Sequence, residues 1–113
     1  MTWDQASAQC RSLGGHLVVV TSEEEQTYVH LFTSSHYDDS MKPVVCFWMD
    51  GKDEESENHW YWDWTGQPLE YTNWYPTEPS NTGDKENCLG THKGGIWNDY
   101  PCYYKCHAIC EKE

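Results

Sequence analysis

Six cysteines in a chain of 113 residues are the feature that most restricts how this sequence can fold. A chain this short has a small hydrophobic core, and such a cysteine density is typical of domains that are cross-linked by disulfides in an oxidising compartment. Six cysteines allow 15 pairings, and spacing alone does not choose among them. Zinc is the competing interpretation, but no Cys-x-x-Cys pair occurs, and Cys102, Cys106 and Cys110 lack a matching set of histidines. The cysteines therefore favour a disulfide framework.

The length of the chain indicates how many domains it forms, and its charge indicates which binding partners are disfavoured. Its length predicts one domain, covering residues 1–113. Its 19 acidic and 7 basic residues give a formal net charge of −12, which disfavours nucleic acid and anionic membranes as partners and suits bound cations. Carboxylates that serve only solubility explain the charge outside the loops equally well.

The sequence shows no secretory signal and no apolar run long enough to span a membrane, so direct membrane insertion is not expected. A protein with disulfides must nevertheless be exported. We therefore expect a mature form or an excised domain, either secreted or belonging to the extracellular portion of a cell-surface protein.

Hydrophobic periodicity and turn signals predict an order of helices and strands. Capping boxes predict helices that begin after Thr2 and after Ser22. Their apolar faces are expected to hold Trp3, Ala6, Cys10 and Leu13, and Tyr28, Val29, Leu31 and Phe32. Short strands are expected at 16–20, 44–49, 60–64 and 107–111, an acidic turn at 50–58 and an aperiodic loop at 75–95. Of the histidines, His16 and His107 are expected in the core, and His30, His36 and His59 at the surface.

The stretch from 78 to 99 is rich in oxygen ligands on an irregular backbone. It reads EPSNTGDKENCLGTHKGGIWND, with four carboxylates and three side-chain amides: Glu78, Asp84, Glu86, Asp99, Asn81, Asn87 and Asn98. Ca²⁺ prefers six to eight oxygen ligands in a flexible geometry, so the composition suits a calcium loop. The alternative is a solvated acidic turn without a ligand.

The order of these residues resembles the sugar-binding signature of C-type lectin domains. That family carries Glu-Pro-Asn or Gln-Pro-Asp, then a Glu, then Trp-Asn-Asp, framed by cysteines. Here the first triplet is Glu78-Pro79-Ser80, and Ser80 departs from both common forms. The likeness extends over almost the whole chain, from the first helix at 3–10 to Ile109-Cys110-Glu111 at the end.

The resemblance implies an α+β fold of the C-type lectin type, with two helices flanking small antiparallel sheets, a long Ca-binding loop and disulfide cross-links. It implies the pairs Cys10–Cys110 and Cys88–Cys102. Cys46 and Cys106 remain; we predict a third bridge between them, with an intermolecular disulfide as the alternative. The family's usual N-terminal strand should precede Trp3, where only two residues stand. Either this strand has been trimmed away or the chain manages without it, and the terminal strand is then expected to have one edge less well paired.

The resemblance also implies two calcium sites. The primary Ca²⁺, which also contacts the sugar, would be held by Glu78, Ser80, Glu86, Asn98 and Asp99. A second Ca²⁺ would be held by Asp53, Glu57, Asn81 and Glu86. Asn81 replaces a carboxylate in that second set, which lowers the charge around the ion and its affinity. For Asp53 and Glu57 a solvated acidic turn is the alternative.

These residues predict calcium-dependent sugar binding, with glycans or glycoproteins as partners. Glu78 favours mannose, GlcNAc or fucose-type sugars, whereas Ser80 leaves galactose open. Trp74, Tyr75 or His92 could stack on a sugar ring, although Trp74 is expected in the core. Affinity at one site should be weak, so oligomers would serve avidity. The alternative is a related domain that recognises a protein, mineral or ice surface with Ca²⁺ only structural or absent; no motif groups a nucleophile, base and acid, so an enzyme is not expected.

Overall fold

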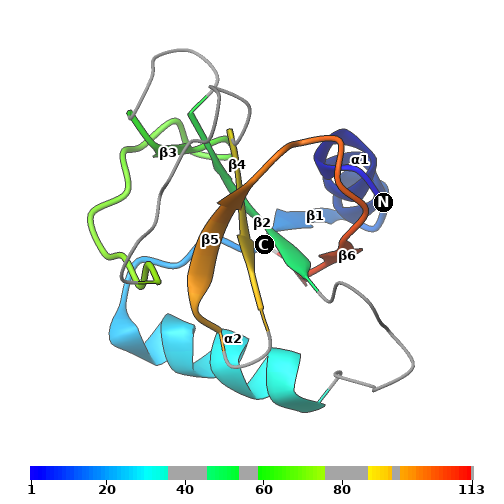
Figure 1. Cartoon of the computed structure of the whole chain (residues 1–113). Coiled ribbons are helices and arrows are strands. Elements are labelled where there is room, and N and C mark those ends of the chain that lie inside the picture. The colour runs from blue at the N-terminus through cyan, green and yellow to red at the C-terminus, as the bar shows by residue number, and fades with distance from the viewer. Residues whose placement is uncertain (36–45, 54–58, 76–86, 93–94, 113) are drawn as a thin grey trace.

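The computed structural model describes residues 1–35, 46–53, 59–75, 87–92 and 95–112 (Figure 1). The elements in chain order are α1 (Trp3–Ser12), β1 (Gly15–Leu17), α2 (Glu23–Ser35), β2 (Phe47–Lys52), β3 (Tyr61–Trp62), β4 (Cys88–Thr91), β5 (Trp97–Tyr100), β6 (His107–Ala108) and β7 (Cys110–Lys112). The α+β composition is the one that the sequence predicts.

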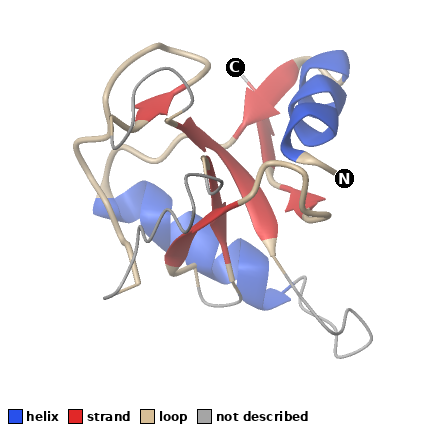
Figure 2. Cartoon of the chain, turned by 45° about the horizontal axis from the view of Figure 1, so that its top comes forward, coloured by secondary structure: helices blue, strands red, loops and turns tan. Residues whose placement is uncertain are grey.

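A central sheet separates the two helices. Its strands follow the order β3-β2-β4-β5, and β6 pairs with β2 in parallel. The pairings of β2 with β3, of β2 with β4 and of β4 with β5 are antiparallel. A second, two-stranded sheet pairs β1 with β7. Helix α2 lies along one side of the central sheet, and α1 lies on the other side beside β1 and β6 (Figures 1 and 2).

Both helices begin where their capping residues predict. The Thr2 hydroxyl accepts the Gln5 N–H, and the Gln5 side chain accepts the Thr2 N–H, which completes a capping box. Ser22 accepts the Glu25 N–H at the start of α2. Helix α1 buries Trp3, Ala6, Ser7 and Cys10, and α2 buries Gln26, Val29 and Thr33. The predicted apolar faces were therefore wrong at Leu13, Tyr28 and Leu31, which are exposed.

The predicted strands and loops needed corrections, beginning with the strand expected at 16–20, which ends at Leu17, and the strand expected at 44–49, which runs on to Lys52. Strand β4 forms inside the segment predicted as an aperiodic loop, because its residues 88–91 pair with both β2 and β5. Asp50 lies within β2 and not in a turn. The strand expected at 60–64 is reduced to β3. The predicted terminal strand divides at Ile109, whose N–H bonds to Trp48 and whose carbonyl bonds to Val18, so that the chain leaves β2 and joins β1.

Three disulfides cross-link the elements. Cys10–Cys110 joins α1 to β7, Cys46–Cys106 joins the residues before β2 and β6, and Cys88–Cys102 joins β4 to the turn after β5. These are the three expected pairs, and the third pair is formed within the chain. In the chain-entropy treatment, loops of this size are each worth roughly 3–5 kcal/mol, so the bridges supplement a small core.

The first residue extends the packing at the end of the chain. The Met1 amino group donates to the Cys106 carbonyl and the Cys106 N–H donates to the Met1 carbonyl, both at 2.9 Å. Strand β7, which ends the described chain, pairs with β1. Within the described residues, no helix combines the length and apolarity that crossing a membrane requires.

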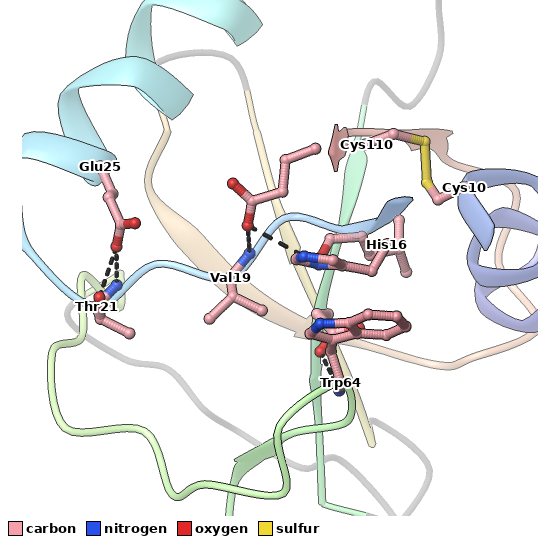
Figure 3. Close-up of polar contacts among 10 residues, drawn as sticks. Cys10, His16, Val19, Thr21, Glu25, Trp64 and Cys110 are labelled. Atoms are coloured by element: carbon pink, nitrogen blue, oxygen red, sulfur yellow. Dashed lines mark hydrogen bonds and ion pairs between the residues drawn. A yellow bond between two sulfur atoms is a disulfide. The ribbon is translucent and has the colours of Figure 1, made fainter. Parts of the chain in front are cut away.

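The histidines differ in how deeply they are buried, depending on the element that carries each one. His16 is buried on β1 and stacks on Trp64, with ring centroids 4.6 Å apart (Figure 3). His30 and His59 are exposed, as predicted. The prediction was wrong for His107, which is exposed because β6 is a short outer strand; His36 lies outside the described residues.

Asp50 is a fully buried carboxyl group in the middle of β2. Its Oδ2 accepts the Trp64 N–H at 2.6 Å, and its Oδ1 has no hydrogen-bond partner among the described residues. Burial raises the pKa of Asp50 to about 7, and the nearby Asp63 adds to the rise, while the Trp64 N–H, His16 and Arg11 oppose it. The folded protein therefore holds a proton here that the unfolded chain releases near pH 4.

We predict that this carboxyl group lowers stability as the pH rises from about 4 to about 7, because over this window the unfolded chain binds fewer protons than the folded one. Asp50→Asn removes the titration and should flatten that part of the stability profile, with a relative gain of at most about 4 kcal/mol above pH 7. Urea unfolding between pH 4 and 8 measures the effect, and Asp4→Asn controls for the same change at an exposed position. Parallel profiles for Asp50→Asn and the wild type would contradict the assignment.

Candidate functional site

Trp97, the first residue of β5, directly precedes the predicted ligands Asn98 and Asp99 and is anchored by several contacts. Its indole N–H donates to the Gln26 side chain of α2 at 2.8 Å. Trp62 and Trp74 pack edge-on against it, with ring centroids 5.8 and 5.9 Å away. The indole is fully buried, so the start of β5 is fixed by a helix, by the core and by a hydrogen bond.

The turn before β5 is fixed by the same glutamine. Gln26 Nε2 donates to the Gly95 carbonyl at 2.6 Å, and Asn73 Nδ2 donates to it at 3.1 Å. Gly95 has a positive φ of 78°, and a Cβ there would lie 2.7 Å from Gln26 Nε2. The position therefore requires glycine both for its backbone conformation and for the close approach of α2.

The outer edge of β5 carries the segment that precedes residues 76–86. The Trp97 N–H donates to the Asn73 carbonyl and the Tyr75 N–H donates to the Trp97 carbonyl, both at 2.9 Å. This is a parallel bridge between Trp74 and Trp97. Trp74 is half-buried against Trp97 and matches its expected core role, whereas Tyr75 is exposed.

Asn98 and Asp99 lie in the middle of β5, opposite Gly90 and Leu89 of β4. Their exposed fractions are 9% and 2%. Because side chains alternate along a strand, Asn98 lies on the same face as Tyr100, and its Nδ2 is 3.5 Å from the Tyr100 hydroxyl. Two of the predicted ligands are thus adjacent along a rigid strand, with side chains that leave its backbone on alternate faces.

Asp53 follows the end of β2 and lies beside the start of β4. Its N–H donates to the Asn87 carbonyl at 3.1 Å, and its exposed fraction is 1%. A solvated turn is therefore the wrong description for Asp53. The partner of Asp53 in this hydrogen bond, Asn87, directly follows Glu86 in the sequence. Glu86 and Asp53 both belong to the second predicted calcium site.

The other predicted ligands lie outside the described residues: Glu57, Glu78, Ser80, Asn81 and Glu86. Within the described part of the chain, no group of three or more His, Cys, Asp or Glu side chains could hold a metal ion. The chemistry of the described donors nevertheless fits calcium, because Asn98 and Asp99 offer an amide and a carboxylate oxygen, both hard ligands. Their place on a paired strand limits how far they can rearrange.

A second polar region lies between β1, α2 and β7. A pocket of about 250 Å³ there is lined by residues that include His16, Glu25, Trp64 and Glu111. Glu111 accepts the Val19 N–H at 2.9 Å, and Glu25 accepts the N–H and hydroxyl of Thr21 at 2.6 and 2.7 Å (Figure 3). These carboxylates hold the segment after β1, so we assign the pocket a structural role.

Sequence reasoning missed two residues that shape the site, Gln26 and Tyr100, and it gave His92 only a stacking role on a sugar ring. Gln26 lies at helical spacing from the buried Val29 and Thr33, and a polar residue on a buried helix face was the available signal. Tyr100 follows the recognised triplet directly. Its hydroxyl lies 3.0 Å from His92 Nε2, a contact across β4 and β5 that no local pattern indicates.

Comparison with known proteins identifies the family. The Lectin C-type domain family matches residues 1–112, and the chain belongs to it. The chain is 34% identical over 113 residues to the hepatic lectin of Gallus gallus, which covers 99% of this chain; the chain spans about half (50%) of that relative's length. The predicted membership is therefore confirmed.

Solved structures share the fold over nearly the whole chain. The cow C-type carbohydrate-recognition domain of CD23, determined in the presence of GlcNAc2Man3 oligosaccharide, has a TM-score of 0.80 and 32% identity, covering 97% of this chain and 78% of that one. A calcium-independent type II antifreeze protein has a TM-score of 0.77 and 31% identity, covering 97% and 77%. The solved structures that are similar to this chain therefore include both a carbohydrate-recognition domain and a calcium-independent protein.

We predict that Gln26→Leu destabilises the protein by about 2–4 kcal/mol, because it removes a buried acceptor from the Trp97 indole and a donor from the Gly95 carbonyl. Gln9→Leu makes the same change at an exposed position of α1 and serves as the control. Urea unfolding compares the two variants with the wild type. Equal stability of the two variants would show that Gln26 does not fix β5.

Proposed function

We propose that this domain binds carbohydrate through a calcium ion and catalyses no reaction. The observation that carries the proposal is the pair Asn98 and Asp99, held in the middle of β5 directly after the anchored Trp97. Asn98 offers an amide oxygen and N–H donors, and Asp99 offers its carboxylate and its backbone carbonyl, so together they supply the hard oxygen ligands and the donor that a cation shared with a sugar needs.

The connections of the chain support the rest of the proposed ligand set. Glu78 follows Tyr75 by three residues, and Tyr75 is bonded to Trp97. Glu86 directly precedes Asn87, which is bonded to Asp53. The described residues on either side of residues 76–86, Tyr75 and Asn87, are therefore bonded to β5 and to the residue that follows β2.

We assign Glu78, Ser80, Glu86, Asn98 and Asp99 to the primary calcium and sugar site. A calcium ion bound there supplies coordination positions for two neighbouring sugar hydroxyls. The carboxylates of Glu78 and Glu86 accept hydrogen bonds from those hydroxyls, and the Asn98 amide donates to them. This donor and acceptor order favours mannose, GlcNAc or fucose-type diols, and the short Ser80 side chain leaves galactose open.

A second calcium site at Asp53, Glu57, Asn81 and Glu86 belongs to the same proposal. The burial of Asp53 and the hydrogen bond from its N–H to the Asn87 carbonyl support it, because Asn87 directly follows Glu86 in the sequence. Asn81 lowers the charge of this set, so we expect this site to bind calcium more weakly than the primary site.

The family membership fits a protein that works outside the cell on glycans or glycoproteins. The three disulfides suit an oxidising compartment. Several copies of the domain would increase avidity for a clustered glycan. We propose such a setting, either secreted or on a cell surface.

The similar calcium-independent antifreeze protein favours a second candidate function. In that case the domain would recognise a protein, mineral or ice surface, and calcium would be structural or absent. Asn98 and Asp99 distinguish the two functions, since only the first makes sugar binding depend on them.

We predict that Asp99→Asn, which keeps the size of the side chain and removes its charge, lowers retention on immobilised sugar in calcium at least tenfold, because a ligand carboxylate is lost. Glu24→Gln makes the same change on the exposed start of α2 and should leave retention unchanged. Elution from a mannose or galactose column measures the effect, with circular dichroism as the check of folding. Undiminished calcium-dependent retention of Asp99→Asn would show that the assigned site is wrong.

A further inference from the structure

A buried tyrosine connects the predicted ligand Asn98 with a histidine at the surface. The Tyr100 hydroxyl lies 3.5 Å from Asn98 Nδ2 and 3.0 Å from His92 Nε2. Tyr100 and Asn98 are buried on β5, and the exposed His92 follows β4. The three polar groups thus form a line from the solvent to the amide of the ligand.

The local backbone explains how the tyrosine reaches both partners. A Cβ atom at Gly90 would lie 2.7 Å from Tyr100 Cδ2 and Cε2, so the ring occupies the space that a side chain at position 90 would need. Gly90 is directly opposite Asn98 in the β4–β5 register. Trp48 supports the ring edge-on, with centroids 5.9 Å apart. The tyrosine therefore has little freedom to move.

The donor and acceptor inventory assigns a direction to this line. An amide NH₂ has two N–H donors, and a tyrosine hydroxyl has one donor and two lone pairs. The Tyr100 oxygen accepts one N–H of Asn98. When the His92 ring carries its proton on Nδ1, the Tyr100 hydroxyl donates its own proton to His92 Nε2. With its nitrogen held by Tyr100, the Asn98 amide presents its oxygen on the opposite end and keeps its second N–H for a ligand.

We propose that His92 and Tyr100 are positioning residues that fix the orientation of the Asn98 amide for calcium and sugar. We call the hydrogen-bonded residues Asn98, Tyr100 and His92 the relay. This inference rests on the proposed function, because orienting the Asn98 amide matters only if that amide binds calcium and sugar. The terminal torsion of an asparagine side chain is broad, so an unsupported amide would rotate. Hydrogen bonds that orient a ligand from behind raise metal affinity by removing this freedom.

The first test observes the relay without calcium. Side-chain amide signals of Asn98 in the full calcium-free chain are assigned by their loss in Asn98→Asp. Tyr100→Phe keeps the ring on Gly90 and Trp48 and should shift the Asn98 amide pair, because the hydroxyl partner is gone. Tyr104→Phe removes a hydroxyl from a ring that packs against Tyr100 at 6.1 Å and should leave the pair in place.

The second test measures calcium affinity by calorimetry. Tyr100→Phe should weaken it by about two- to tenfold, the effect of one neutral hydrogen bond, and Tyr104→Phe should not change it. His92→Leu should act in the same direction as Tyr100→Phe, and His92→Gln, which restores an acceptor, should recover part of the loss. Because His92 is exposed, these two variants keep the test valid if Tyr100→Phe folds poorly.

The outcomes separate the two proposals. A wild-type protein that binds calcium and a folded Tyr100→Phe variant with unchanged amide signals and unchanged affinity would overturn the relay alone. A wild-type protein that binds no calcium would overturn the proposed function and the positioning role together, whatever the amide signals show.

Discussion

The hydrogen bond between Gln26 and Trp97 is the interaction on which the rest of the site depends. It joins α2 to the first residue of β5 at 2.8 Å, and the same glutamine holds the turn at Gly95. Trp97 in turn bonds through its backbone to Asn73 and Tyr75. One buried amide therefore connects a helix, a strand and the start of the segment that carries Glu78. Asn98 and Asp99 directly follow Trp97 on β5, so the Gln26 hydrogen bond also fixes their positions.

The disulfides and the buried tryptophans both stabilise the folded state of this acidic chain. The net charge of −12 opposes compaction, and the core of a domain this size is limited. Three bridges reduce the entropy of the unfolded chain, while Trp48, Trp62 and Trp97 fill the core around the central sheet. The rigidity that results is useful for binding, because ligands set on paired strands need little reordering.

Much of this architecture could be predicted from the sequence. The capping boxes locate both helix starts because their hydrogen bonds are local. The family resemblance gives the pairs Cys10–Cys110 and Cys88–Cys102, and the two cysteines that remain, Cys46 and Cys106, form the third pair. Strand β4 was missed because residues 88–91 form a strand only by pairing with β2 and β5, which lie far away in the sequence.

The residues around the candidate site divide in the same way. Asn98 and Asp99 were proposed as ligands from a local triplet. Other site residues act through contacts between separate elements, namely Gln26, Tyr100 and His92. Hydrophobic periodicity describes one helix or strand at a time, so it does not predict such contacts. Asp50 was misplaced for a related reason: a charged residue suggests a turn, whereas this one is buried in β2 with its carboxyl bonded to Trp64.

A glycan array probed with the wild-type domain in calcium, and again in EDTA, tests the central claim most directly. The account predicts binding to a set of terminal sugars in calcium and its loss in EDTA. The sugars retained would show which diol the Glu78-Pro79-Ser80 triplet selects. Absence of binding in both conditions, or binding that persists in EDTA, would contradict a calcium-dependent sugar site built on Asn98 and Asp99.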